Sequence, residues 1–179
     1  MYRKSRRCGF VKLILREKNS KVNLKVPFTF SSPNPNSIEI KFRTVEKDFD
    51  PFQINEEGNW IDLKAAEDVT LKAGDFALIS LGVAMKLPAG FEAWLAPRSS
   101  TFKKWGIIQT NSIGIIDNSY CGNDDIWKMP VYATRDTEIK KGDRIAQFRI
   151  IPSMIMACLN RVDELSSENR GGFGSTGHR

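Results

Sequence analysis

The segment Thr110-Asn111-Ser112-Ile113-Gly114-Ile115-Ile116-Asp117-Asn118-Ser119-Tyr120-Cys121-Gly122 joins an apolar run to a turn. Its first half is rich in isoleucine, a β-branched residue that favours a half-buried strand. Its second half is rich in Asp, Asn, Ser and Gly, which are typical of turns. We therefore predict a strand that ends at a loop, with the carboxylate of Asp117 at the junction and the ring of Tyr120 three residues further on. Taken alone, the segment favours a plain β-hairpin whose polar residues only form the turn, and the other stretches below change that balance.

The rest of the chain predicts an all-β domain. Short apolar runs recur between turn residues from Ile38 onward, after a linker-like stretch at residues 31–37. Helical periodicity is confined to a few residues, and Val162 to Ser166 is the only candidate for a short helix. Many short strands at regular spacing favour a jelly-roll-like sandwich or barrel.

The positive charge of the chain is concentrated at its N-terminus. The 179 residues carry a net charge of +6, and residues 1–26 contain nine Lys and Arg against the single acid Glu17. We expect a basic, disordered extension at 1–37, a folded domain at 38–166 and a flexible glycine-rich arm at 167–179. A basic extension can contact nucleic acid or anionic lipid. We favour a solvated extension, so nucleic acid is not an expected partner of the domain.

Cysteine and histidine usage excludes several classes of site. The three cysteines are scattered without a C-x-x-C spacing, which suits a reducing compartment. The single histidine, His178, lies one residue from the C-terminus. A histidine-based nucleophile or a histidine-rich metal centre is therefore excluded from the domain. Apolar runs stay below the roughly 18 residues of a membrane span, and we expect a cytoplasmic protein without a membrane partner.

Two stretches in the first half of the domain carry side chains suited to phosphate chemistry. Ile61-Asp62-Leu63 places an acid between apolar residues at a strand edge. Ala96-Pro97-Arg98-Ser99-Ser100-Thr101 offers a guanidinium fork and three hydroxyls after a proline that ends a strand. Such donors match the oxygens of a phosphate. Taken singly, each stretch is also an ordinary turn or polar loop.

Two later stretches complete the pattern. Lys141-Gly142-Asp143-Arg144-Ile145-Ala146-Gln147 is a turn that leads into a strand, with Gln147 predicted on the same face as Ile145. Arg170-Gly171-Gly172-Phe173-Gly174-Ser175-Thr176-Gly177 has the glycine content of a backbone that can wrap phosphate. It lacks the lysine of a Walker motif, and a disordered tail is the alternative.

These five stretches, in this order, resemble the five motifs of the trimeric dUTP diphosphatase (dUTPase) family. The first motif departs most, because it usually reads Ala-Gly-Tyr-Asp-Leu and only Asp62-Leu63 match. The resemblance implies a homotrimer with an exchanged C-terminal arm. It implies hydrolysis of dUTP to dUMP and pyrophosphate, which removes dUTP and supplies dUMP for thymidylate synthesis.

The resemblance also implies roles for single residues. Asp117 would be the general base for a water that attacks the α-phosphorus, and Asp62 would reach Mg²⁺ through water while the triphosphate holds the ion. Tyr120 would stack on the sugar and exclude a 2′-hydroxyl, and Phe173 would stack on uracil. The remaining substrate contacts implied are Arg98, Ser99, Ser100 and Gln147 for phosphates, Asn111, Ile115, Ile116 and Ile126 for the base, and Arg170, Gly174, Ser175 and Thr176 for closure.

Two alternatives belong to other functional classes. The related dCTP deaminases share the fold and the Arg-Ser-Ser motif, but they lack the glycine-rich tail and need a Glu where Asn123-Asp124-Asp125 stand here. A nucleotide-gated regulatory protein with the same fold is the second alternative.

Overall fold

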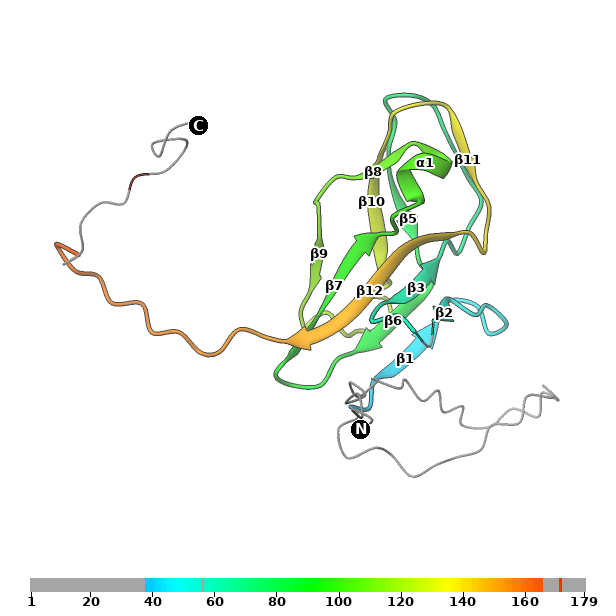
Figure 1. Cartoon of the computed structure of the whole chain (residues 1–179). Coiled ribbons are helices and arrows are strands. Elements are labelled where there is room, and N and C mark those ends of the chain that lie inside the picture. The colour runs from blue at the N-terminus through cyan, green and yellow to red at the C-terminus, as the bar shows by residue number, and fades with distance from the viewer. Residues whose placement is uncertain (1–37, 56, 166–170, 172–179) are drawn as a thin grey trace, which may run out of the picture.

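The computed structural model describes residues 38–55, 57–165 and 171 (Figure 1). Within that part of the chain the secondary structure is twelve strands and one short helix. Their bounds are β1 Lys41–Thr44, β2 Phe52–Ile54, β3 Ile61–Lys64, β4 Val69–Leu71, β5 Phe76–Ser80, β6 Val83–Lys86, β7 Phe91–Pro97, α1 Thr101–Trp105, β8 Ile107–Gln109, β9 Gly114–Ile116, β10 Lys128–Ala133, β11 Thr137–Ile139 and β12 Arg144–Pro152. The all-β prediction is confirmed.

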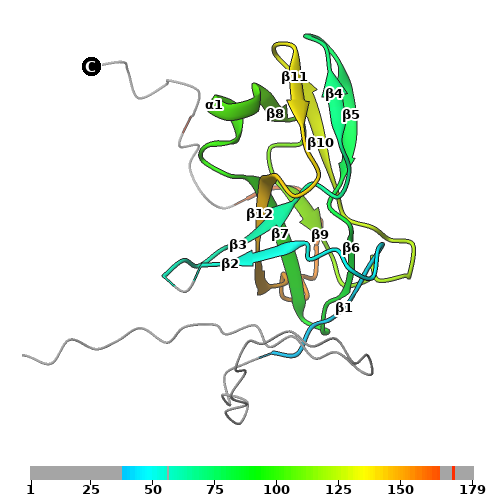
Figure 2. The ribbon, with the colours of Figure 1, turned by 90° about the vertical axis from the view of Figure 1, so that its right-hand side faces the viewer.

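The largest sheet has five strands in the order β2-β3-β12-β7-β9. A three-stranded sheet has the order β5-β10-β8, and two-stranded sheets pair β1 with β6 and β11 with β4. Every pairing is antiparallel. Both ribbon views place β4, β5, β8, β10, β11 and α1 at one end of the domain and β1 and β6 toward the other (Figures 1 and 2).

The core lies between these sheets and is aromatic at its centre. Trp127 and Phe148 are almost completely buried, and their rings meet edge to face with centroids 5.3 Å apart. Such contacts add to the free energy gained by burying apolar area. Because Phe148 belongs to β12, the central strand of the large sheet, the core holds in place the strand that also carries Gln147.

The strand that precedes Asp117 is present as predicted, since β9 ends at Ile116. The predicted helix at 162–166 is wrong over its described residues, 162–165, which form no helix and are exposed. A helix of a few residues is stable only when it packs against other elements, and residues 162–165 have no such support. The one helix in the described chain is α1, which buries Thr101 and Trp105.

After β12 the chain leaves the domain as an extended segment, residues 153–165 (Figure 1). Most of its large apolar side chains are almost fully exposed, namely Met154, Ile155, Met156, Leu159 and Leu165, and Val162 is about half exposed. None of the described helices has the length and apolarity to cross a membrane.

Candidate functional site

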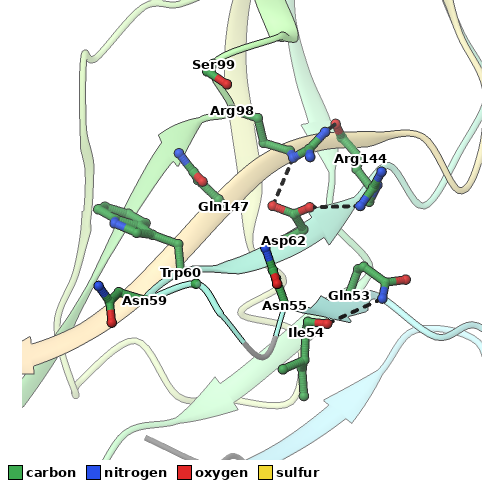
Figure 3. A pocket seen from close by; sticks show the side chains of 11 residues that line it. Gln53, Ile54, Asn55, Asn59, Trp60, Asp62, Arg98, Ser99, Arg144 and Gln147 are labelled. Carbon is green, nitrogen blue, oxygen red and sulfur yellow. Dashed lines mark hydrogen bonds and ion pairs between the residues drawn. The ribbon is translucent and has the colours of Figure 1, made fainter. Parts of the chain in front are cut away.

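A pocket of about 420 Å³ opens on the large sheet where β2, β3 and β12 lie side by side and β7 ends (Figure 3). The antiparallel register places Gln53, Asp62 and Gln147 next to one another across these strands. Most side chains that line the pocket are polar or charged. The lining residues are Gln53, Ile54, Asn55, Gly58, Asn59, Trp60, Asp62, Arg98, Ser99, Arg144 and Gln147.

Asp62 is held between two guanidinium groups at the floor of this pocket. Arg98 Nε lies 2.9 Å from Asp62 Oδ1, and Arg144 Nη1 lies 3.3 Å from Asp62 Oδ2 (Figure 3). The Asp62 side chain is 14% exposed and that of Arg144 is 45% exposed. Two positive charges against one negative charge leave the described lining net positive. The pocket is therefore suited to an anion with several oxygens, since guanidinium groups bind such oxygens in pairs.

Arg98 is oriented by the start of α1. Its backbone N–H donates to Thr101 Oγ1 at 3.0 Å, and the buried Thr101 hydroxyl donates to the carbonyl of Ile145 at 2.8 Å. This chain of bonds ties the end of β7 to β12. Ser99 lines the pocket, whereas Ser100 is the N-cap residue of α1 and lies outside the lining.

A bulge in β12 decides where Gln147 points. The pairing of β12 with β3 shifts between Arg144 and Ala146, so Ile145 is an extra residue in the ladder. Ile145 and Ala146 are both buried, and Gln147 lines the pocket and donates through Nε2 to the Pro97 carbonyl at 3.1 Å. The prediction that Gln147 shares a face with Ile145 is wrong, because a bulge breaks the two-residue alternation of a strand.

Asp117 lies at the opposite edge of the large sheet, directly after β9. Its Oδ1 accepts hydrogen bonds from the hydroxyl of Ser119 and, at 2.7 Å, from the backbone N–H of Ser119. These bonds, the hydroxyl's first, lower the pKa of Asp117 from its ordinary value. The exposed carboxylate is therefore fully ionised at neutral pH.

The other residues predicted to surround the base and sugar cluster near Asp117. Ile115 and Ile116 belong to β9, where Ile115 is 67% exposed and Ile116 packs on the core. Tyr120 is exposed, and its hydroxyl donates to the carbonyl of Ile126 at 3.4 Å. Asn111 lies in the turn between β8 and β9. This side of the site thus presents one carboxylate, one ring and one amide.

The structure does not bring the two groups of predicted residues together within one chain. The pocket of Asp62, Arg98, Ser99 and Gln147 lies on β2, β3, β12 and the end of β7, and the cluster around Asp117 follows β9 at the other edge. No hydrogen bond or ion pair joins them in the described chain. Arg170, Phe173, Gly174, Ser175 and Thr176 lie outside the described residues.

Sequence reasoning missed several residues of the pocket wall. Arg144 lies in the motif of residues 141–147, which predicts no role for it, although its guanidinium donates a hydrogen bond to Asp62. Trp60 stands where the first motif usually has Gly, and the guanidinium carbon of Arg149 lies 5.7 Å from the Trp60 ring centroid. For Arg144 a usable signal existed, since its guanidinium lies in a motif expected to bind phosphate and is chemically suited to that role. For Gln53 and Asn59 the sequence carries no such signal, since neither lies in a recognised motif.

A resident metal ion does not match the donors present. The described residues contain no group of three or more His, Cys, Asp and Glu side chains placed to hold a metal. Asp62, the one carboxylate in the described lining, already has a guanidinium on each oxygen. These donors fit an ion that arrives with its own oxygen ligands and water and contacts the protein through that water.

Comparisons with known proteins identify the family of this chain. The family model described as dUTPase matches residues 56–177. The SPbeta prophage-derived deoxyuridine 5'-triphosphate nucleotidohydrolase YosS of Bacillus subtilis (strain 168) is 54% identical over 140 residues, which cover 78% of this chain and 99% of that protein. The deoxyuridine 5'-triphosphate nucleotidohydrolase of Thermobifida fusca (strain YX) is 34% identical over 149 residues, 82% of this chain and 83% of that protein.

A solved structure shows the same fold. A mutant dUTPase of Staphylococcus bacteriophage 80alpha with dUpNHpp superposes with a TM-score of 0.65 at 23% identity, and the match covers 78% of this chain and 98% of that one. At this identity the likeness concerns the fold alone. The matching family model and the relative at 54% identity show that the chain belongs to the dUTPase family.

Proposed function

We propose that this protein is a dUTP diphosphatase that hydrolyses dUTP to dUMP and pyrophosphate. The observation that carries the proposal is the pocket of Asp62, Arg98, Ser99 and Gln147, in which residues of three family motifs converge around a net positive floor. A triphosphate carries about four negative charges, so charge stabilisation and positioning account for most of the catalysis. Membership in the dUTPase family supplies the substrate.

In the proposed reaction a water molecule attacks the α-phosphorus and gives its proton to Asp117. The bond from the α-phosphorus to the bridging oxygen breaks, and pyrophosphate leaves. The hydrogen bonds from Ser119 keep Asp117 ionised before substrate binds. They also make it a weak proton acceptor, and the negative charge of a bound triphosphate raises its pKa again by repulsion.

The phosphate oxygens are bound by this chain's own cations and donors. Arg98 and Arg144 face the pocket, and Ser99 and Gln147 supply neutral donors. Ser100 adds a second hydroxyl at the start of α1. Mg²⁺ carried by the triphosphate would neutralise charge that develops on the leaving pyrophosphate, and Asp62 would hold it through water.

Asn111, Ile115, Ile116 and Ile126 would surround uracil, and the ring of Tyr120 would leave no room for a 2′-hydroxyl. This arrangement selects deoxyribose by shape. The hydrogen bond from Tyr120 to the Ile126 carbonyl supports the assignment, because it holds the ring beside the proposed base site.

We further propose a homotrimer in which each active site combines groups from different chains. The two halves of the site lie at opposite edges of one sheet, so a neighbouring chain is needed to complete each half. The extended segment 153–165, with its exposed apolar side chains, supports an exchanged C-terminal arm. Residues 38–166 would form the catalytic domain, residues 1–37 a dispensable basic extension and residues 167–179 the closing arm, with Phe173 on uracil and Arg170, Gly174, Ser175 and Thr176 over the phosphates.

The proposal is tested by measuring pyrophosphate release with Mg²⁺ from each deoxynucleoside triphosphate and from UTP. We expect turnover of dUTP alone. Release of ammonia from dCTP would instead identify a dCTP deaminase, and binding without turnover would favour a nucleotide-gated regulator.

Asp117→Asn tests the proposed base. We expect kcat to fall by a factor on the order of 10² to 10⁴, since a positioned general base contributes that much. Affinity for a non-hydrolysable dUTP analogue should stay within a few-fold, because the amide keeps the shape of the carboxylate. Asp136→Asn, at an exposed Asp that pairs with Lys72, is the matched control and should keep full activity. Normal turnover by the Asp117 variant would assign the proton to another acceptor.

A further inference from the structure

Gln109 is a buried polar residue next to the proposed uracil site. It is the last residue of β8 and is 4% exposed, among apolar neighbours. Its Nε2 donates to the backbone carbonyl of Leu95 at 3.1 Å and to Asn111 Oδ1 at 2.9 Å. Both N–H groups of its amide are thus used within the protein.

The carbonyl of Leu95 determines which way the Gln109 amide faces. Leu95 lies in β7 of the large sheet, and its carbonyl oxygen can only accept hydrogen bonds. Turning the amide by 180° would place Oε1 against that oxygen, two acceptors facing each other without a proton. It would also move Nε2 to the position of Oε1, which is buried and has no partner in the described chain. The observed orientation is therefore the only one that makes both hydrogen bonds.

The orientation of the Gln109 amide determines the orientation of the Asn111 amide. Because Gln109 presents a donor, Asn111 must turn its oxygen toward it, and its Nδ2 faces another direction. Gly114, the first residue of β9, lies on that side: a Cβ on Gly114 would be 3.7 Å from Asn111 Nδ2. The exposed Asn111 side chain thus offers N–H groups to whatever lies along β9.

We propose that Gln109 is a positioning residue for base selection, which makes Asn111 a hydrogen-bond donor and so favours a 4-oxo pyrimidine over a 4-amino pyrimidine. Position 4 of uracil is a carbonyl that accepts an N–H. Position 4 of cytosine is an amino group. It would face the NH₂ of Asn111, and two donors cannot form a hydrogen bond with each other. A site built to pair one polar group rejects the analogue that leaves it unpaired. The inference rests on the proposed function, because it takes Asn111 as a contact to the base.

Gln109→Glu and Gln109→Met separate positioning from packing. Burial raises the pKa of a carboxyl, so Gln109→Glu is measured at alkaline pH, where the carboxylate is ionised and cannot donate. Under that condition the Asn111 side chain would turn its NH₂ toward the new carboxylate and its oxygen toward the base. We expect the ratio of kcat/KM for dUTP to that for dCTP to fall about tenfold or more. Met keeps the length of the side chain without any hydrogen bond, leaves Asn111 free to turn, and should give a smaller fall. The same order should appear in the dissociation constants of dUMP and dCMP, measured by calorimetry.

Two controls make the result specific. Thr134→Val removes one side-chain hydrogen bond of similar kind, to the Gly106 carbonyl, and should lower the melting temperature without changing the nucleotide ratio. In an Asn111→Ala background, the Gln109 substitutions should change the ratio by less than about twofold, since residues that act through one another are not additive.

The outcomes are distinguishable. An unchanged ratio in both Gln109 variants, or an equal fall with and without Asn111, would overturn the proposal and leave Gln109 a purely structural residue. A wild-type protein that fails to hydrolyse dUTP would instead overturn the proposed function. If Gln109→Glu fails to fold, the Gln109→Met variant and its Asn111→Ala double mutant decide the question by themselves.

Discussion

At the residue scale, the protonation of Asp117 depends on its neighbour Ser119. The hydroxyl and the backbone N–H of Ser119 both donate to the same carboxylate oxygen, and the pKa of Asp117 is lowered as a result. The active form of a general base is the deprotonated one, so a lowered pKa extends activity toward acid pH. Asn118, between the two in sequence, makes no such contact in the described hydrogen bonds.

Ser119→Ala should therefore move the acid limb of the pH profile. The hydroxyl is the largest cause of the shift, and its loss raises the pKa of Asp117 toward the ordinary value. We expect kcat/KM for dUTP to begin its fall at a higher pH than in the wild type, with little change at neutral pH. The pH dependence of kcat/KM measures this, with Thr134→Val as a control for general destabilisation. An acid limb that stays in place would show that another group controls it.

Single residues also show how far a sequence can be interpreted without coordinates. Sequence motifs predict the site residues Asp62, Arg98, Ser99 and Gln147. The structure places all four in one pocket, and their roles stay predictions. The motif around Arg144 does not single it out, because charged residues are common in turns. Its contact with Asp62 spans 82 positions in the chain, which no local pattern encodes.

At the scale of elements, α1 connects the proposed phosphate-binding residues to the core. The helix ends at Gly106, whose φ of 63° is left-handed, and the Gly106 N–H donates to the Phe102 carbonyl at 2.7 Å. The guanidinium of Arg135 donates hydrogen bonds to the carbonyls of Lys103 and Lys104 at the same end. A left-handed glycine and a nearby cation are common ways to satisfy the last carbonyls of a helix.

Gly106→Ala should destabilise the domain in two ways. A left-handed backbone costs a residue with a Cβ about 1–2 kcal/mol, and here that Cβ would lie 2.7 Å from Arg135 Cγ. Gly90→Ala is the matched control, since Gly90 also has a positive φ, of 82°, but has no atom within 4 Å of its Cβ position. We expect a lower melting temperature for both and a larger fall for Gly106→Ala. Equal falls would mean that Arg135 moves aside freely.

At the scale of the whole molecule, the segment after β12 exposes a large apolar surface. Residues 153–165 are extended and expose a series of large apolar side chains. Exposed apolar surface of this extent is typical of an interaction site. In the proposed trimer a neighbouring domain covers it, and the same exchange unites the halves of each active site.

Two truncations separate assembly from catalysis. Ending the chain after Pro152 removes the exposed segment, and we expect the trimer to dissociate because that segment would contribute much of the interface. Ending it after Glu168 keeps the segment but removes the glycine-rich end, so the trimer should persist while kcat falls sharply. Analytical ultracentrifugation and dUTP turnover measure both effects. A trimer that survives truncation after Pro152 would place the interface on the sheets.

The sequence by itself determined the β class of the domain and the position of Asp117 after a strand. β-Branched runs and turn residues act on their immediate neighbours, so these features can be predicted from short windows. The sequence was wrong about the helix at 162–166, which lacks a packing partner over its described residues, and about the face of Gln147, which the bulge at Ile145 changes. Only the tertiary structure determined that two guanidinium groups contact Asp62 and which way the Asn111 amide faces. Each of these depends on a partner that another strand supplies, such as the Leu95 carbonyl that orients Gln109.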